Sequence, residues 1–281
     1  MITNATSDKE TAKKFYDALK VECGKFDIEL LLFTNVEAYF ETLHEFEKPK
    51  FISYWCKDYK LARYFEKLGI RVFNSSKSIE ICDDKAKTYI ELLDVGVKQP
   101  KSIVSPYFYY QEQFDVDIIV DKAIEELGKD IVVKECMGAF GKEVSLATNR
   151  EELKNKILQI GKKPYILQEQ IKESFARDIK VEIVGDFYCA MKRVNTNGDF
   201  RANLNSGGVG ENYKLNEQQL SICRKAIKAV GLDFGGVDLL FGKNDEPIIC
   251  EVNSNSSFLH IGEVTKTNIP CELVKYMLKL V

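Results

Sequence analysis

The first third of the chain alternates between amphipathic stretches and short apolar runs. Apolar residues recur at four-residue spacing from Phe15 to Cys23, which predicts a helix over 5–25. Ser7 or Asp8 is suited to cap that helix at its amino end. The elements predicted next are strands at 28–34, 51–55 and 70–73 and a helix at 59–68. Strands that alternate with helices are typical of a small parallel sheet with crossover connections.

A similar alternation continues through the middle of the chain. A helical stretch at 84–93 comes first, and Gly96 and Pro100 close it. The pattern then predicts strands at 118–120, 131–134, 143–148 and 165–170 and helices at 122–127 and 151–159.

Hairpins dominate the last third. Two β-rich runs at 179–184 and 187–193 flank the short turn Gly185-Asp186, which predicts an antiparallel pair. The remaining predicted elements are a helix at 216–230, a second hairpin formed by 236–241 and 247–252, and a loop and terminal helix within 263–280. The whole pattern predicts an α+β protein with a parallel sheet at its amino end.

The composition is that of an ordinary globular chain. Of 281 residues 45% are hydrophobic, and 40 Lys and Arg against 43 Asp and Glu give a formal net charge of -3. A nucleic-acid partner usually demands a basic excess, so this balance argues against one. No apolar run reaches the roughly 18 residues of a membrane span, and residues 1–14 lack the apolar core of a signal peptide. We therefore expect a cytoplasmic protein with no membrane partner.

Eight cysteines are scattered through the sequence without a Cys-x-x-Cys pair. Most lie in apolar runs, as Cys250 does, which is typical of buried free thiols in a reducing compartment. The chain has only two histidines, His44 and His260, so a zinc site is not favoured either.

A lysine followed by a glycine-containing loop is the first candidate for chemistry. Lys134 ends an apolar strand, and Gly138 and Gly141 follow shortly after it. A lysine on a buried strand needs an anion, and glycines let backbone N–H groups approach a phosphate. The loop lacks the Gly-Lys-Ser/Thr ending of a Walker motif. The alternative is an ordinary turn after a solvated lysine.

Two carboxylates and an amide form the second candidate. Glu251 and Asn253 lie two residues apart on the last predicted strand, so they share a face, and the hairpin brings Asp238 beside them. Such hard oxygen ligands suit Mg²⁺, and a cation would relieve the repulsion between the carboxylates. The alternative is that Glu251 pairs with a basic side chain while Asp238 points to water.

Two arginines near a glycine-rich segment form the third candidate. Arg193 ends one predicted strand, and Arg201 precedes the glycines at 207–210. Arginines in such a place suit a phosphate or a substrate carboxylate, and a surface hairpin with solvated arginines is the alternative.

Together these features resemble an ATP-grasp ligase of the RimK-like branch of amino-acid and peptide ligases. The resemblance covers nearly the whole chain and is strongest from Cys82 to Phe258. It implies a fold of three lobes: a small parallel, Rossmann-like lobe at 1–83, a central lobe at 84–170 and a C-terminal lobe with the metal site at 171–281. The two later lobes, both α+β, would enclose the nucleotide.

The resemblance also implies roles for individual residues. Lys85 and Lys134 would bind ATP phosphates, and the loop from Gly138 to Gly141 would cover them. The other implied nucleotide contacts are Glu169 and Gln170 at the adenine, Asp178 at the ribose side, and Arg201 and Asn203 at the phosphates. The implied catalytic residues are Arg193 and Arg201, and the implied magnesium ligands are Asp238, Glu251 and Asn253.

Three features depart from the family pattern. Lys180 stands where the family commonly has arginine, so a bidentate fork would be lost. The segment 253–258 lacks the frequent Pro-Gly, which implies a differently shaped loop near the substrate. Residues 1–4 leave little of the expected first strand.

The resemblance implies an ATP-dependent carboxylate–amine ligase that forms an amide or peptide bond through an acyl phosphate. ATP and Mg²⁺ are the implied cofactors, with two ions and with Mn²⁺ as a substitute, and an amino acid or peptide is the implied substrate. A catalytically inactive nucleotide-binding module and a peptide-tailoring ligase for a macromolecular partner are the alternatives. A homodimer is the default assembly, because dimers are the commonest oligomers.

Overall fold

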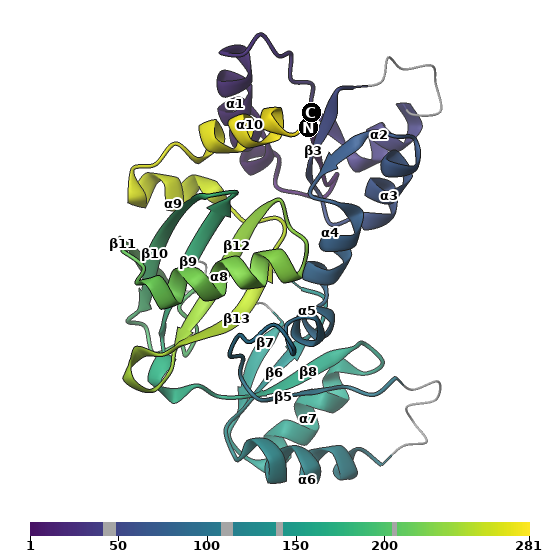
Figure 1. The fold of residues 1–281 in the computed structure, drawn as a ribbon. Coiled ribbons are helices and arrows are strands. Elements are labelled where there is room, and N and C mark those ends of the chain that lie inside the picture. The colour runs from purple at the N-terminus through teal and green to yellow at the C-terminus, as the bar shows by residue number, and fades with distance from the viewer. Residues whose placement is uncertain (42–48, 108–114, 139–142, 204–206) are drawn as a thin grey trace.

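The computed structural model describes residues 1–41, 49–107, 115–138, 143–203 and 207–281, and the strands of these ranges form three sheets (Figure 1). The N-terminal sheet has the order β2-β1-β3-β4 with parallel neighbours, so the predicted parallel sheet is confirmed. Its elements are β1 (Ile2–Thr3), α1 (Lys9–Gly24), β2 (Phe33–Thr34), α2 (Asn35–Glu41), β3 (Phe51–Trp55), α3 (Tyr59–Lys67), β4 (Arg71–Phe73) and α4 (Ser76–Asp83). The short β1 lies between β2 and β3, and the Asp8 side chain caps α1 by accepting from the N–H of Thr11 at 2.8 Å.

The central sheet has the order β5-β8-β6-β7 with antiparallel neighbours. Its elements, with the helix that precedes them, are α5 (Lys85–Glu91), β5 (Ser102–Val104), α6 (Val116–Leu127), β6 (Ile131–Glu135), β7 (Val144–Ala147), α7 (Arg150–Ile160) and β8 (Tyr165–Glu169). Helices α6 and α7 lie together on the side of this sheet away from the rest of the molecule (Figure 1).

One prediction in this lobe is wrong. The expected strand at 118–120 and helix at 122–127 are a single helix, α6. The Asp115 side chain caps it by accepting from the N–H of Asp117 at 3.0 Å. Val120 and Ala123 are fully buried at helical spacing, whereas Ile118 is exposed. The apolar run therefore follows helical spacing against the core, not the alternation of a strand.

The C-terminal sheet has the order β11-β10-β9-β12-β13, and both predicted hairpins are confirmed as antiparallel pairs. The elements of this lobe are β9 (Arg177–Val184), β10 (Phe187–Asn195), β11 (Gly208–Asn212), α8 (Glu217–Ala229), β12 (Phe234–Phe241), β13 (Pro247–Asn253), α9 (Phe258–Thr265) and α10 (Ile269–Lys279). Helix α8 packs across β12 and β13, and α9 packs on β10 and β11. Helices α2, α4 and α9 were not predicted, and the strand predicted at 28–34 is reduced to the two residues of β2.

The N-terminal and C-terminal lobes share one hydrophobic core. Helix α1 packs against α10, and Leu19, Phe73, Phe234 and Phe258 belong to one buried cluster. The central lobe has a separate cluster that draws only on residues 103–167. The N-terminal lobe also has a cluster of its own, drawn from residues 2–79. Leu92, in the predicted central lobe, belongs to a cluster of the C-terminal lobe. The domain boundaries expected at 83/84 and 170/171 therefore stay a prediction.

A buried asparagine joins the N-terminal sheet to the C-terminal one. Asn74 follows β4 and is fully buried. Its Nδ2 donates to the carbonyl oxygens of Phe234 and Ser254 at 2.9 and 3.1 Å, and its Oδ1 accepts from the N–H groups of Asp233 and Phe234 at 2.8 and 3.2 Å. Phe234 begins β12 and Ser254 follows β13, so this one amide fixes the ends of two neighbouring strands.

We expect Asn74→Ala to lower the free energy of unfolding by at least about 3 kcal/mol. The substitution leaves the buried backbone groups that now bind the Asn74 amide without a hydrogen-bond partner. Urea denaturation followed by circular dichroism measures the loss. Asn149→Ala is the matched control, because the Asn149 side chain caps α7 by accepting from the N–H of Glu152 at 2.9 Å. Removal of this cap should lower the free energy of unfolding by about 1 kcal/mol. Equal losses in the two variants would contradict the role of Asn74.

Candidate active site

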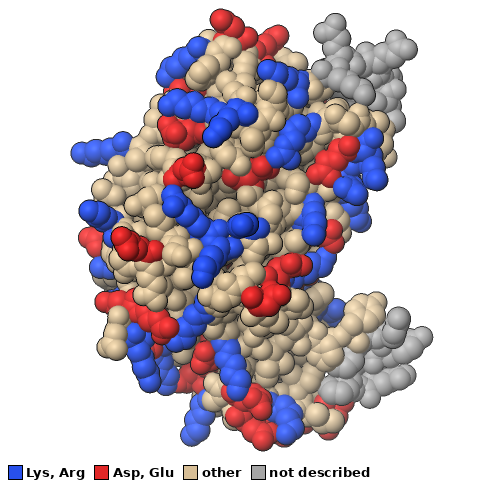
Figure 2. All heavy atoms as spheres, viewed as in Figure 1, with Lys and Arg blue, Asp and Glu red and all other residues tan. Residues whose placement is uncertain are grey.

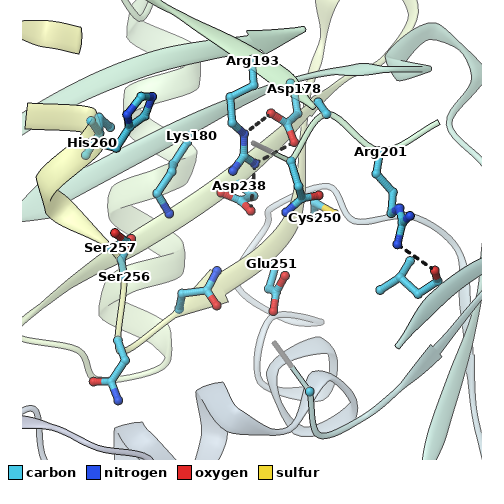
Figure 3. A pocket seen from close by; sticks show the side chains of 18 of the residues that line it. Asp178, Lys180, Arg193, Arg201, Asp238, Cys250, Glu251, Ser256, Ser257 and His260 are labelled. Atoms are coloured by element: carbon cyan, nitrogen blue, oxygen red, sulfur yellow. Dashed lines mark hydrogen bonds and ion pairs between the residues drawn. The ribbon is translucent and has the colours of Figure 1, made fainter. Parts of the chain in front are cut away.

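Alternate residues of β9 and its neighbours give one face of the C-terminal sheet its charge. Asp178, Lys180 and Glu182 share this face because strand residues two apart point to the same side. The register sets Arg193 of β10 opposite Asp178 and Asp238 of β12 opposite Lys180. Figure 3 shows Asp178, Lys180, Arg193 and Asp238 together on the wall of a cavity of about 1290 Å³.

Arg193 is held between two buried carboxylates. Its Nε and Nη2 donate to the two oxygens of Asp178 at 2.6 and 2.7 Å, and Nη2 lies 3.1 Å from Oδ2 of Asp238. The bidentate pair fixes the plane of the guanidinium group. Arg193 still lines the cavity although only 4% of it is exposed. The structure therefore places this predicted catalytic residue in the site with a fixed orientation.

The three predicted metal ligands lie on one face. The register pairs Asp238 with Glu251, and it pairs Gly236 with Asn253 two residues further along the strands. The Oδ1 atom of Asp238 is buried and accepts no hydrogen bond within the described residues. Burial acts to raise the pKa of Asp238, but the charges of Arg193, Lys180 and Lys134 outweigh it and hold that pKa below its ordinary value. An ionised carboxylate with an unused buried oxygen fits a cation.

The donor set for such a cation has to include an amide. In the described ranges no group of three or more His, Cys, Asp or Glu side chains is placed to hold a metal ion. Asn253, on the same face as Asp238 and Glu251, is the residue that would supply a third oxygen to a bound cation. Carboxylate and amide oxygens together suit Mg²⁺ and leave room for phosphate oxygens and water.

A β-bulge brings Cys250 into the same site. The register of β12 and β13 shifts after Asp238, which leaves Cys250 as the extra residue of β13. Bulges re-aim side chains in this way next to active sites. The Cys250 Sγ lies 3.7 Å from Nζ of Lys134, a residue of the central sheet. The central lobe therefore places a cation directly against the strand that carries Glu251.

Both predicted phosphate-binding lysines reach this site. Lys134 is 8% exposed, so the alternative of a solvated lysine does not hold. The Nζ of Lys85, at the start of α5, lies 3.8 Å from Oε1 of Glu251 and donates to the carbonyl oxygen of Gly138 at 3.4 Å. Within the described ranges, neither lysine has a short carboxylate contact that would prevent it from binding a phosphate.

The predicted loop and adenine residues line the cavity as far as the structure describes them. Gly138 lines it, and a Cβ there would lie 2.6 Å from Oε2 of Glu143. Gly141 lies outside the described residues. Glu169 and Gln170 line the cavity at the end of β8, and Oε1 of Glu169 accepts from the N–H of Lys101 at 2.8 Å.

The remaining predicted contacts lie on the wall of the cavity. Arg201 and Asn203 line it. Arg201 pairs with Asp199 at 2.7 Å and its Nη1 donates to the carbonyl oxygen of Val144 at 3.4 Å, which links it to the central sheet. Asp178 also lines the cavity, but both its oxygens bind Arg193. Its predicted contact with ribose stays a prediction, and its geometry is that of a support for Arg193.

Sequence reasoning missed Glu182, the next charged residue on the same face of β9. It is 1% exposed, and its Oε2 has no hydrogen-bond partner in the described part of the chain. Burial raises the pKa of Glu182, and the Lys180 charge and the nearby Ser256 hydroxyl offset only part of that effect. The spacing of Asp178, Lys180 and Glu182 at every second residue was the signal that could have identified it.

We expect Glu182→Gln to stabilise the protein relative to the wild type more at pH 8 than at pH 5. Because the folded-state pKa of Glu182 is raised, wild-type stability is fully present below the unfolded pKa of about 4.3 and is lost as the pH rises through the folded value. Urea denaturation of both proteins at the two pH values measures this. Glu211→Gln, at an exposed glutamate of the same sheet, is the control for loss of charge. A stability difference that is equal at both pH values would refute the expectation.

Aromatic residues that the sequence did not identify as site residues also line the cavity. Phe15 of α1 and Trp55 at the end of β3 both line the cavity. The Phe15 ring stacks on Phe258 of α9 at 4.6 Å and meets Trp55 edge-on at 5.8 Å. The shared core of the N-terminal and C-terminal lobes therefore extends to the wall of the cavity.

The cysteines, the helices and the surface charges bear on the wider expectations. All eight cysteines are free thiols. No helix in the described ranges is long and apolar enough to cross a membrane. On the face shown in Figure 2, basic and acidic side chains are interspersed, in line with the nearly balanced composition.

Comparison with known proteins gives a consistent result. A family model described as the RimK-like ATP-grasp domain matches residues 82–277. Human N-acetylaspartylglutamate synthase A is 33% identical over 225 residues, which cover 79% of this chain and 56% of that protein. A probable alpha-L-glutamate ligase 1 of Shewanella sp. (strain W3-18-1) is 34% identical over 224 residues, which cover 79% of this chain and 71% of the ligase. The chain thus spans little more than half the length of the human relative.

A solved structure extends the likeness to the whole fold. The D-alanine–D-alanine ligase of Bacillus anthracis complexed with ATP has a TM-score of 0.74 to this chain. The match covers 99% of this chain and 94% of that ligase at 18% identity. At such low identity the likeness shows the fold alone, and that fold is the predicted α+β arrangement.

Proposed function

The chain belongs to the RimK-like ATP-grasp family, and from this premise we propose that it is an ATP-dependent carboxylate–amine ligase. One observation carries the proposal. Lys134 of the central lobe lies against β13 of the C-terminal lobe, so cations from one lobe face the Asp238 and Glu251 carboxylates of the other across a single cavity. A nucleotide triphosphate with Mg²⁺ needs this combination of charges.

Different residues of the chain bind the phosphates, the adenine and Mg²⁺. Lys134 and Lys85 bind the phosphates, and Gly138 gives the backbone close access to them. Glu169 and Gln170 border the adenine at the end of β8, where backbone N–H and C=O groups are available to the base edge. Asp238, Glu251 and Asn253 hold Mg²⁺, which we propose as two ions. When bound, Mg²⁺ neutralises charge on the β- and γ-phosphates.

The reaction we propose has two steps. A substrate carboxylate oxygen bonds to the γ-phosphorus as the bond from that phosphorus to the ADP oxygen breaks, which gives an acyl phosphate and ADP. A neutral amine then attacks the acyl carbon, inorganic phosphate leaves, and the amine proton passes to solvent. Arg193 and Arg201 stabilise the negative charge that develops in both steps.

Neither step needs a side-chain nucleophile. Cys250 lies beside the phosphate-binding Lys134, and burial raises the pKa of its thiol, which keeps it neutral. The proposed substrate is an amino acid or peptide, and the relatives point to glutamate as the first amine to test, since both their names contain it. Free thiols throughout the chain agree with a reaction in the cytosol.

A substrate screen tests the proposal. Purified protein is incubated with ATP and Mg²⁺ and with pairs of carboxylates and amino acids or short peptides, and release of ADP and phosphate is measured together with product masses. The proposal expects ADP and phosphate release that depends on both substrates, with a product heavier than its amine by an acyl group. Tight ATP binding with no turnover on any pair would favour the inactive module. Turnover seen only as a mass increase of a protein or peptide partner would favour the peptide-tailoring ligase.

A further inference from the structure

The wall of the cavity changes character beyond the metal ligands, on the side away from Cys250. Figure 3 shows Lys180 and His260 on one side of Asp238, while Cys250 lies on the other. The register sets Asp238 of β12 and Met191 of β10 opposite Lys180, which belongs to the strand between them. All three residues line the cavity. In this row across the strands, the charged side chains therefore end at Lys180 and an apolar one follows.

Two helices continue the wall from there, and each turns one face to the cavity. Residues three and four apart lie on the same face of a helix. Both helices line the cavity with the same spacing, which comprises Thr11, Ala12 and Phe15 in α1 and His260, Ile261 and Val264 in α9. In each helix a polar residue comes first and two apolar residues follow it. The cavity therefore borders an apolar helix face in each of two lobes.

The large apolar residues of this region belong to one packed cluster. Trp55, Met191 and Ile261 are members of the core that the N-terminal and C-terminal lobes share, and Phe15 and Val264 pack against it. All five line the cavity, and we call them the apolar wall. Apolar surface that faces water inside a cavity is unfavourable until a ligand covers it. The apolar wall is therefore a surface suited to an apolar group of a ligand.

The distance from the metal ligands suits a side chain of a substrate. Neighbouring strands lie about 4.8 Å apart, so Met191 on β10 is about 10 Å from Asp238 on β12, with β9 between them. A substrate held beside Arg193 for the reaction would thus reach the apolar wall with its side chain. None of the five wall residues carries a charge. An acidic or basic side chain would lose its hydration there without gaining a partner.

We propose that the apolar wall binds an apolar side chain of the amino-acid or peptide substrate, of the size of leucine, methionine or phenylalanine. The inference rests on the proposed ligase function and narrows its substrate class, because one partner in the new amide bond carries this side chain. Glutamate, the first amine to test, has an acidic side chain. In a reaction with glutamate, the carboxylate-bearing partner would therefore carry the apolar group.

A single tryptophan makes occupancy of the apolar wall directly measurable. Trp55 is the one tryptophan of the chain, so tryptophan emission reports on this wall. Protein saturated with Mg²⁺ and a non-hydrolysable ATP analogue is titrated with two sets of ligands, and calorimetry gives their affinities. In N-acetyl amino acids only the carboxylate is free, and in amino-acid amides only the amine is free. Each set contains the derivatives of glycine, glutamine, leucine and phenylalanine.

We expect the leucine or phenylalanine derivative to bind about 10–100-fold more tightly than the glycine and glutamine derivatives in at least one set, and to change the emission of Trp55. A preference in the N-acetyl set would assign the apolar side chain to the carboxylate-bearing partner, and one in the amide set to the amine-bearing partner. Equal binding of apolar and polar derivatives in both sets, or no binding, would overturn the proposal. So would tight binding that leaves the emission unchanged. Failure of the ATP analogue to bind would instead count against the proposed function.

Ala12→Phe tests where the side chain lies. Ala12 is one turn before Phe15 on the same face of α1 and lines the cavity. A phenylalanine there should fill the space in front of the apolar wall and weaken binding of the preferred derivative by at least about 10-fold. The glycine derivative and the ATP analogue should bind as before. Ala18→Phe is the matched control, because Ala18 is half-buried on the same helix but lies outside the lining of the cavity.

Val264→Thr is the second variant, and it decides the question if Ala12→Phe does not fold. It replaces one methyl group of the apolar wall by a hydroxyl of similar size. Binding of the preferred derivative should weaken by about 5-fold, because the hydroxyl would lose its hydration under the ligand. An unchanged preference for the apolar derivative in both variants would place the side chain elsewhere and overturn the proposal.

Discussion

Asp238→Asn should reduce ADP formation by at least about 100-fold while the protein stays folded. The substitution keeps the size of the side chain but removes the negative charge through which we propose that Asp238 binds Mg²⁺. Arg193 keeps its bidentate pair with Asp178 at 2.6 and 2.7 Å, so the fold loses only the single contact at 3.1 Å. The measurement is the steady-state rate of ADP release at several Mg²⁺ concentrations, together with the urea midpoint.

The rate of the variant should also respond differently to Mg²⁺. A weakened ligand set needs a higher Mg²⁺ concentration for half-maximal rate, whereas a merely structural defect would lower the rate at every concentration equally. Asp186→Asn is the control, since Asp186 is exposed in the turn between β9 and β10. A full rate for Asp238→Asn at low Mg²⁺ would remove Asp238 from the metal site.

Local pattern was sufficient to predict much of the C-terminal lobe. The turn Gly185-Asp186 and the β-rich runs around it specify the β9–β10 hairpin, and strand alternation by itself puts Glu251 and Asn253 on one face. These features depend on neighbours in the sequence. Contacts between residues distant in the sequence could be predicted only from the family resemblance. It placed Lys134 and Asp238 in one site although 103 residues separate them in the chain.

What the sequence could not predict depends on pairings between distant strands. Glu182 belongs to the site because β9 lies between β10 and β12, an order that the sequence does not state. The bulge at Cys250 is a register shift, which local alternation does not encode. At 118–120 local pattern was misleading, because the buried side of α6 is set by the helices and strands it packs against.

Arg193→Met is the substitution with the largest expected effect on both stability and activity. It leaves the carboxylates of Asp178 and Asp238 buried together without the guanidinium that now binds both. Removing one partner of a buried ionic network costs about 3–5 kcal/mol. ADP formation should also fall by at least about 100-fold, because the variant loses the fixed positive charge that we propose stabilises the transition state. Urea denaturation and the rate of ADP release measure the two losses separately.

A double variant separates the structural part of that effect from the chemical part. Adding Asp178→Asn to Arg193→Met removes one of the two buried carboxylate charges that Arg193→Met leaves unpaired. The double variant should therefore be more stable than the single one. Its rate of ADP formation should stay low, because a neutral amide at position 178 restores no cation to the cavity. Arg193→Lys should fall between the wild type and Arg193→Met in both measurements, since it keeps the charge but not the fork that binds Asp178. If the double variant regained activity along with stability, Arg193 would be a structural residue, and the charge that stabilises the transition state would have to come from Arg201 and the two lysines.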